Sequence, residues 1–119
     1  MFCGGAASHD RDEREPGTEW WAQEEIDEAD MRRLPEGQHI DWIVSHAKPP
    51  AFDLPGCGHG MIDRSVGYLE EIRLKYRPSR WFFGHYHRHG TGCIDGCRWM
   101  GLDYPGHRGP WHYGMLLTD

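Results

Sequence analysis

Histidine is the residue type in this sequence that points most directly to chemistry. The chain has nine histidines in 119 residues. His46 directly follows the apolar run 40–45, and His85 and His87 belong to the segment Gly84-His85-Tyr86-His87. Side chains two residues apart in an extended segment point to the same side, so His85 and His87 can reach one metal ion or two adjacent ions. Gly84 lets the backbone turn sharply and approach closely as it leaves a strand.

The segments around these histidines predict the elements that position them. Residues 40–45 are rich in apolar and β-branched side chains, which is typical of strands, and residues 80–84 (Arg-Trp-Phe-Phe-Gly) are expected to form the next strand. Between them, Asp63 can cap a helix that ends at Pro78. Its apolar residues recur at three- and four-residue steps and form one face: Val66, Leu69, Ile72 and Tyr76. The expected fold class is therefore α/β.

The strand, helix and strand also predict where the histidines meet. This order favours a right-handed crossover between parallel strands. The carboxyl ends of parallel strands share one edge of a sheet, and open α/β sheets bind their ligands at that edge. His46 and His85 should therefore emerge at the same edge, with Pro49 and Pro50 stiffening the loop after His46. The alternative is that His46 only makes hydrogen bonds in a core or loop.

Further elements are expected on both sides of this unit. We expect them at residues 2–7 (buried strand), 28–34 (helix), 48–60 (loop), 98–102 (strand) and 111–117 (strand). The length leaves room for one hydrophobic core, so residues 1–119 should form a single domain.

The two histidine segments together resemble the last two motifs of the calcineurin-like metallophosphoesterases. The matching segments are Ser45-His46-Ala47-Lys48-Pro49-Pro50 and Trp81-Phe82-Phe83-Gly84-His85-Tyr86-His87. The start of the chain resembles the segment after that family's third motif, through Gly4-Gly5-Ala6, Ser8, Asp10, Arg14, Trp20-Trp21 and Glu24. The resemblance covers most of residues 2–104.

This resemblance implies a fold, an activity and a set of ligands. The family folds as an αββα sandwich, holds two divalent metal ions between its sheets, and hydrolyses phosphomonoesters or phosphodiesters. Carried over by motif, His46 and His85 would ligate one ion and His87 the other. Arg88 and His89 follow the second motif and could contact the phosphate of the substrate. Imidazole suits manganese, iron and zinc alike, so these ligands do not identify the metal.

The amino-terminal motifs of the family have no counterpart here. They are an Asp-x-His, a Gly-Asp and a Gly-Asn-His, and this chain contains no asparagine. The chain therefore resembles the carboxyl-terminal half of a metallophosphoesterase, half of the sandwich with an incomplete metal site. Such a half exposes an apolar sheet face, which we expect an amino-terminal half or a second copy to cover.

Two functions remain open at this stage. The leading interpretation is a fragment of a metal-dependent phosphoester hydrolase. The alternative is a truncated, non-catalytic metallophosphoesterase that acts as a binding or assembly module. A third, more distant interpretation is a small zinc protein that uses Cys93 and Cys97 with a nearby histidine such as His89.

Composition and charge argue against several other classes. No apolar run approaches the roughly 20 residues of a membrane span, and residues 1–7 lack the features of a signal peptide. We therefore expect a cytoplasmic protein with reduced cysteines. The net charge is −6, and residues 1–36 carry 11 acidic against 4 basic residues. An acidic chain is a poor general nucleic-acid binder.

Overall fold

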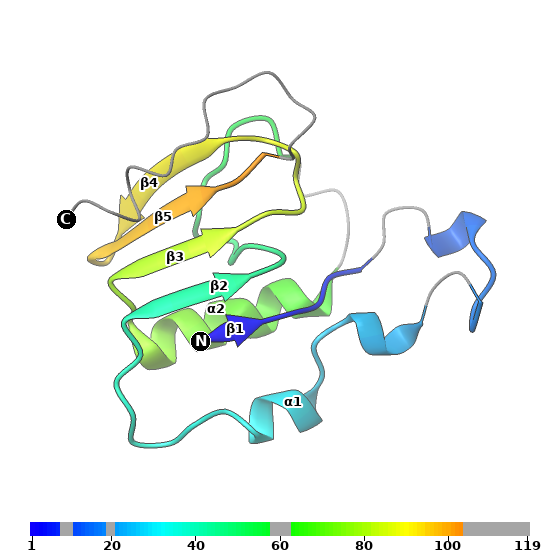
Figure 1. Ribbon diagram of the computed structural model, residues 1–119, viewed down its shortest axis with the longest axis horizontal. Helices are drawn as coiled ribbons and strands as arrows, with labels where there is room; N and C mark the ends of the chain where they lie inside the picture. Colours follow the sequence, from blue (N-terminus) through cyan, green and yellow to red (C-terminus); the bar gives the residue numbers. More distant parts are fainter. Residues whose placement is uncertain (8–10, 19–20, 58–62, 104–119) are drawn as a thin grey trace.

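A five-stranded sheet organises the part of the chain that the structure describes. The computed structural model describes residues 1–7, 11–18, 21–57 and 63–103. The strands are β1 (Phe2–Cys3), β2 (Trp42–Ser45), β3 (Arg80–Phe83), β4 (Gly90–Ile94) and β5 (Cys97–Gly101), in the order β1-β2-β3-β5-β4 (Figure 1). β1, β2, β3 and β5 are parallel, and β4 is antiparallel to β5. This mixed sheet with its helices confirms the α/β class.

The helix α2 (Arg64–Tyr76) connects β2 to β3 and packs against one face of the sheet (Figure 1). Its first turn is capped as expected, because the Asp63 carboxylate accepts a hydrogen bond from the Ser65 backbone N–H at 2.8 Å. The helix ends at Tyr76, and the capping residue that follows, Arg77, has a left-handed φ of 45°. Three of the four predicted apolar positions are buried: Leu69, Ile72 and Tyr76.

The hydrophobic core lies between α2 and the facing side of the sheet. Ile43 on β2, Trp81 on β3 and Trp99 on β5 point to this side and are buried. Phe52, from the loop after β2, also enters the core. Its ring centroid lies 5.4 Å from that of Trp81 and 5.5 Å from that of Trp99. The loop after His46 is therefore anchored by a buried aromatic side chain.

The opposite face of the sheet carries exposed aromatic side chains at β1 and β2. Phe2 is 86% exposed and Trp42 is 41% exposed. Farther along the same face, Phe82 and Met100 are buried. The apolar face that the sequence led us to expect is therefore exposed only in part. Within the described ranges, no helix is long and apolar enough to cross a membrane.

Several elements differ in extent from those expected. β1 has two residues rather than the six of residues 2–7, because the chain leaves the sheet after Cys3 and the Ala6 N–H donates to the Glu24 carbonyl at 2.9 Å. β4 was not expected, and its turn into β5 is formed by Asp95 and Gly96 with φ of 51° and 77°. The expected strand at 111–117 lies outside the described residues. The short helices are η1 (Arg11–Glu13), η2 (Ala22–Glu24) and α1 (Glu28–Arg32).

Candidate functional site

The carboxyl ends of three parallel strands lie in register at one edge of the sheet. The terminal partners on β2, β3 and β5 are Ser45, Phe83 and Gly101. The pairing continues past the strands, since the Gly84 N–H donates to the His46 carbonyl at 3.1 Å and the Leu102 N–H donates to the Phe83 carbonyl at 2.8 Å. The first residues beyond each strand are therefore held by the hydrogen bonds of the sheet.

His46 and His85 lie side by side at this edge. Their ring centroids are 4.6 Å apart, and the rings are tilted by 59°. His46 follows β2 and His85 follows β3, so the parallel pairing of these two strands brings the imidazoles together. The sequence argument from the crossover predicted this placement.

Residues 85–87 are not extended, so the prediction that His85 and His87 lie on the same side of an extended segment is wrong. The segment is a turn, in which His85 and His87 have left-handed φ of 70° and 52° and the Tyr86 N–H donates to the Gly84 carbonyl at 2.8 Å. Residues other than glycine rarely adopt this backbone conformation, and each one that does so lowers the stability of the fold by on the order of 1 kcal/mol. Strained backbone of this kind concentrates at binding and catalytic sites.

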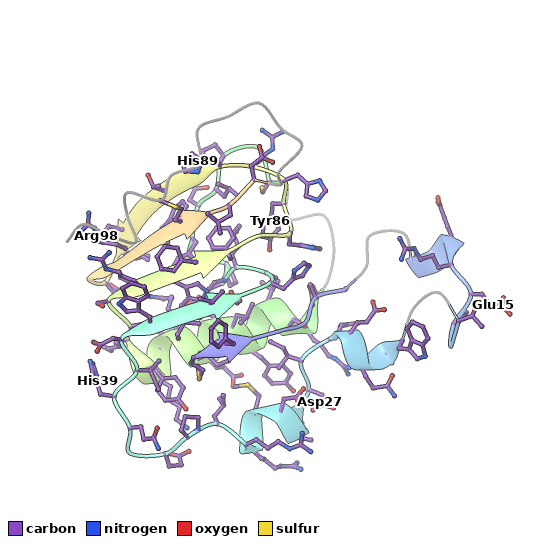
Figure 2. The ribbon with its side chains drawn as sticks, in the orientation of Figure 1. Glu15, Asp27, His39, Tyr86, His89 and Arg98 are labelled. Atoms are coloured by element: carbon purple, nitrogen blue, oxygen red, sulfur yellow. The ribbon has the colours of Figure 1, made fainter. Side chains whose placement is uncertain are left out.

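A cleft of about 640 Å³ opens at the same edge. The residues that line it include the three candidate ligands His46, His85 and His87. Arg88 lines it as well. Cys57 and Asp103 also line it, and Asp103 was not singled out from the sequence as a residue of the site. His89 is exposed just before β4 and is not among the residues that line the cleft (Figure 2).

Arg88 joins the two loops that form the walls of the cleft. Its guanidinium lies directly over Gly56, so a Cβ at Gly56 would stand 2.7 Å from Arg88 Nη1. Gly56 also has a left-handed φ of 78°, which glycine adopts without strain. A glycine at this position therefore lets the arginine approach the loop that follows β2.

The ring of His85 packs against Tyr86, which in turn contacts Lys48. The Tyr86 ring, beyond the end of β3 (Figure 2), meets the His85 ring edge to face at a centroid distance of 5.0 Å. The Lys48 ammonium lies 5.6 Å from the Tyr86 ring centroid, and the Lys48 backbone N–H donates to the Tyr86 hydroxyl at 3.3 Å. Burial lowers the pKa of Lys48 and raises the pKa of Tyr86. Both residues lie inside the histidine motifs. Their packing joins positions 38 residues apart in the sequence, so it could not be predicted from the motifs.

Ser45 fixes the backbone on either side of His46. The Trp81 indole N–H donates to Ser45 Oγ at 2.7 Å, and the Ser45 hydroxyl donates to the Ala47 carbonyl. All three groups are buried. The hydroxyl therefore connects the core of the sheet to the residue that follows His46.

Replacing Ser45 with alanine should destabilise the chain by about 1–3 kcal/mol, because it leaves the buried Trp81 N–H without an acceptor. Urea unfolding measures this loss. The matched control is Ser79→Ala, whose exposed hydroxyl donates to the Asp41 carbonyl at 3.1 Å. The control should cost less than about 1 kcal/mol, and equal losses in the two variants would contradict the role of Ser45.

The donors in the cleft fit a divalent transition metal through their chemistry. Imidazole nitrogen binds manganese, iron and zinc, and His46 and His85 are adjacent with His87 in the same cleft. Across residues 1–7, 11–18, 21–57 and 63–103, no three or more His, Cys, Asp or Glu side chains are grouped closely enough to hold an ion. Two imidazoles are therefore in place, and further ligands would have to move toward them.

The zinc site considered at Cys93 and Cys97 is contradicted by the strand register. Cys93 pairs with Arg98 and Cys97 pairs with Ile94, so the two cysteines point to opposite faces of the sheet. Cys93 is exposed, whereas Cys97 is buried, which raises the pKa of its thiol to about 11. All four cysteines of the chain are free thiols in the structure.

No protein-family model, curated protein or solved structure matched this chain in the comparisons made with each. The structure itself defines an α/β sheet with a histidine-lined cleft at the carboxyl edge of its parallel strands. That edge is the usual ligand site of open α/β sheets. The function is therefore argued from the residues of the cleft.

Proposed function

We propose that the chain is the metal-binding part of a phosphoester hydrolase, in which His46 and His85 hold a divalent ion together with His87. The observation that carries the proposal is the pair of imidazoles 4.6 Å apart at the carboxyl edge of parallel strands. The resemblance of both histidine motifs to the calcineurin-like metallophosphoesterases supports it. Manganese, zinc and iron all suit these ligands.

The proposal includes half of an αββα sandwich as the fold. One face of the five-stranded sheet packs against α2 (Figure 1), and the other exposes Phe2 and Trp42. In such a sandwich this sheet would be one of the two, with its helix on the outside. A second sheet would then cover the exposed aromatic side chains.

The residues of the cleft would have different roles in hydrolysis. A bound divalent ion supplies a polarised phosphoryl oxygen and a more acidic water molecule. His46 and His85 hold the ion, and Tyr86 keeps the ring of His85 in place. Arg88 offers a planar guanidinium that can bind two phosphate oxygens at once. The proposal assigns no role to His89, which lies outside the cleft lining.

One observation favours the second candidate, a non-catalytic binding or assembly module. Phe2 and Trp42 are 86% and 41% exposed on the face of the sheet away from α2. Exposed aromatic side chains of this kind are typical of contact surfaces between proteins. In both candidates, an amino-terminal half or a second copy of the chain would occupy this face.

Hydrolysis of bis-p-nitrophenyl phosphate tests the hydrolase. Because one copy of the chain holds an incomplete site, we expect turnover only from the self-associated chain. With Mn²⁺ it should release p-nitrophenolate, EDTA should stop the release, and Arg88→Ala should slow it roughly 10- to 100-fold through the loss of one charge-assisted phosphate contact. Arg98→Ala, which removes an exposed arginine on β5, is the matched control and should leave the rate unchanged. Self-associated chain that binds Mn²⁺ without EDTA-sensitive release would contradict the hydrolase and favour the assembly module.

A further inference from the structure

The register of β3 and β5 places a carboxylate beside the histidines. Phe83 and Gly101 are the last partners of these parallel strands, and the Leu102 N–H extends the pairing by donating to the Phe83 carbonyl at 2.8 Å. His85 and Asp103 each follow by two residues. Both residues therefore lie just beyond the carboxyl ends of neighbouring strands.

The cleft confirms that Asp103 belongs to the same surface as the histidines. Asp103 lines it together with His46, His85, His87 and Arg88, and it is half-buried. Among the described residues that line the cleft, Asp103 supplies the one carboxylate and Arg88 the one permanent cation.

A metal site formed by imidazoles alone lacks negative charge. Neutral imidazoles leave the charge of a divalent ion uncompensated, and the nearby guanidinium of Arg88 adds to it. Removing that ion from water costs less free energy where anionic groups replace part of its hydration. Over the residues that the structure describes, Asp103 does not form a ligating group of three with the histidines. Its carboxylate would therefore offset the charge after moving toward the ion, or through a water molecule or an imidazole N–H.

We propose that Asp103 is a further residue of the metal site, where its carboxylate supplies the negative charge that the histidines lack. The inference rests on the proposed function, since it concerns the same ion. It adds a residue from a third strand end: His46 follows β2, His85 follows β3 and Asp103 follows β5.

Calorimetric titration of the chain with Mn²⁺, and separately with Zn²⁺, tests the proposal in three variants. Asp103→Asn keeps the shape of the side chain and removes its charge, and should weaken binding about 10- to 100-fold, the usual effect of losing a group that supports metal ligands. Asp103→Glu keeps the charge and should retain most of the affinity. The matched control is Asp53→Asn, which removes an exposed carboxylate outside the cleft lining, and should bind as the parent chain does.

Each outcome bears on one claim. Parent and Asp103→Asn chains that bind Mn²⁺ and Zn²⁺ equally well would overturn the role of Asp103 and leave the proposed function standing. A parent chain that binds neither ion would overturn the proposed function, and this inference with it. Equal weakening in Asp103→Asn and Asp103→Glu, or a matching fall in their thermal stability, would show a structural role and overturn the charge argument.

Discussion

Replacing His85 with alanine is expected to weaken Mn²⁺ binding by more than about 100-fold, because a group that only supports the ligands already contributes 10- to 100-fold. Calorimetric titration measures the change. Alanine retains a Cβ and therefore keeps the backbone strain at the left-handed φ of 70°. The loss of affinity would then report the imidazole itself, and the thermal stability should change little.

The control for this experiment is His39→Ala. His39 Nε2 lies 2.7 Å from an oxygen of Asp41, both side chains are exposed, and the pair precedes β2 at the opposite end of that strand from His46 (Figure 2). Its removal should leave the Mn²⁺ titration unchanged. A titration that His85→Ala does not alter, or that His39→Ala alters equally, would contradict the assignment of the site.

The largest effect on stability is expected at Phe52. This side chain is fully buried, and its ring packs against the rings of Trp81, Phe83 and Trp99 at centroid distances of 5.4, 6.1 and 5.5 Å. Truncating such a residue removes its buried apolar surface and leaves a cavity. Phe52→Ala should therefore destabilise the chain by about 3–5 kcal/mol in urea unfolding.

Phe2→Ala removes the same side chain from a position that is 86% exposed, and it should change the stability by less than about 0.5 kcal/mol. If Phe52→Ala does not fold, Phe52→Leu keeps part of the packing and should cost about 1–2 kcal/mol. Similar losses at positions 2 and 52 would contradict the placement of the loop after His46 against the core.

The parts of the fold that follow from local patterns could be predicted from the sequence. Asp63 is a capping residue at the start of a periodic helix, and the structure shows that cap. The apolar segments on either side of the helix became the parallel strands β2 and β3. Since a strand, helix and strand in this order favour parallel pairing, and parallel strands end at the same edge, the meeting of His46 and His85 followed from the same pattern.

β4 could have been recognised from its turn but not from its strand. Asp-Gly at positions 95–96 is a strong signal for a tight hairpin. The strand itself contains Gly92, which breaks the apolar pattern. The reason is a contact from the neighbouring strand, because a Cβ at Gly92 would stand 2.4 Å from Trp99 Cζ2. The glycine makes room for a tryptophan whose position depends on the pairing of β4 with β5.

The remaining residues of the cleft depend on contacts between distant parts of the chain. Asp103 joins the histidines only because β5 is the parallel neighbour of β3. The Tyr86 hydroxyl accepts a hydrogen bond from the Lys48 backbone N–H, which comes from the loop after β2. The extended geometry assumed for residues 85–87 failed because the strand ends at Phe83, and the next residues turn.

The central claim is that an ion binds at the imidazoles of the carboxyl edge, and paramagnetic broadening by Mn²⁺ tests it most directly. Histidine side-chain resonances of the ¹⁵N-labelled chain would be followed during the titration. We predict that the signals of His46, His85 and His87 broaden at low Mn²⁺ while the signal of His39 stays sharp. Broadening that begins at His39, or that spreads evenly over all histidines, would contradict the claim.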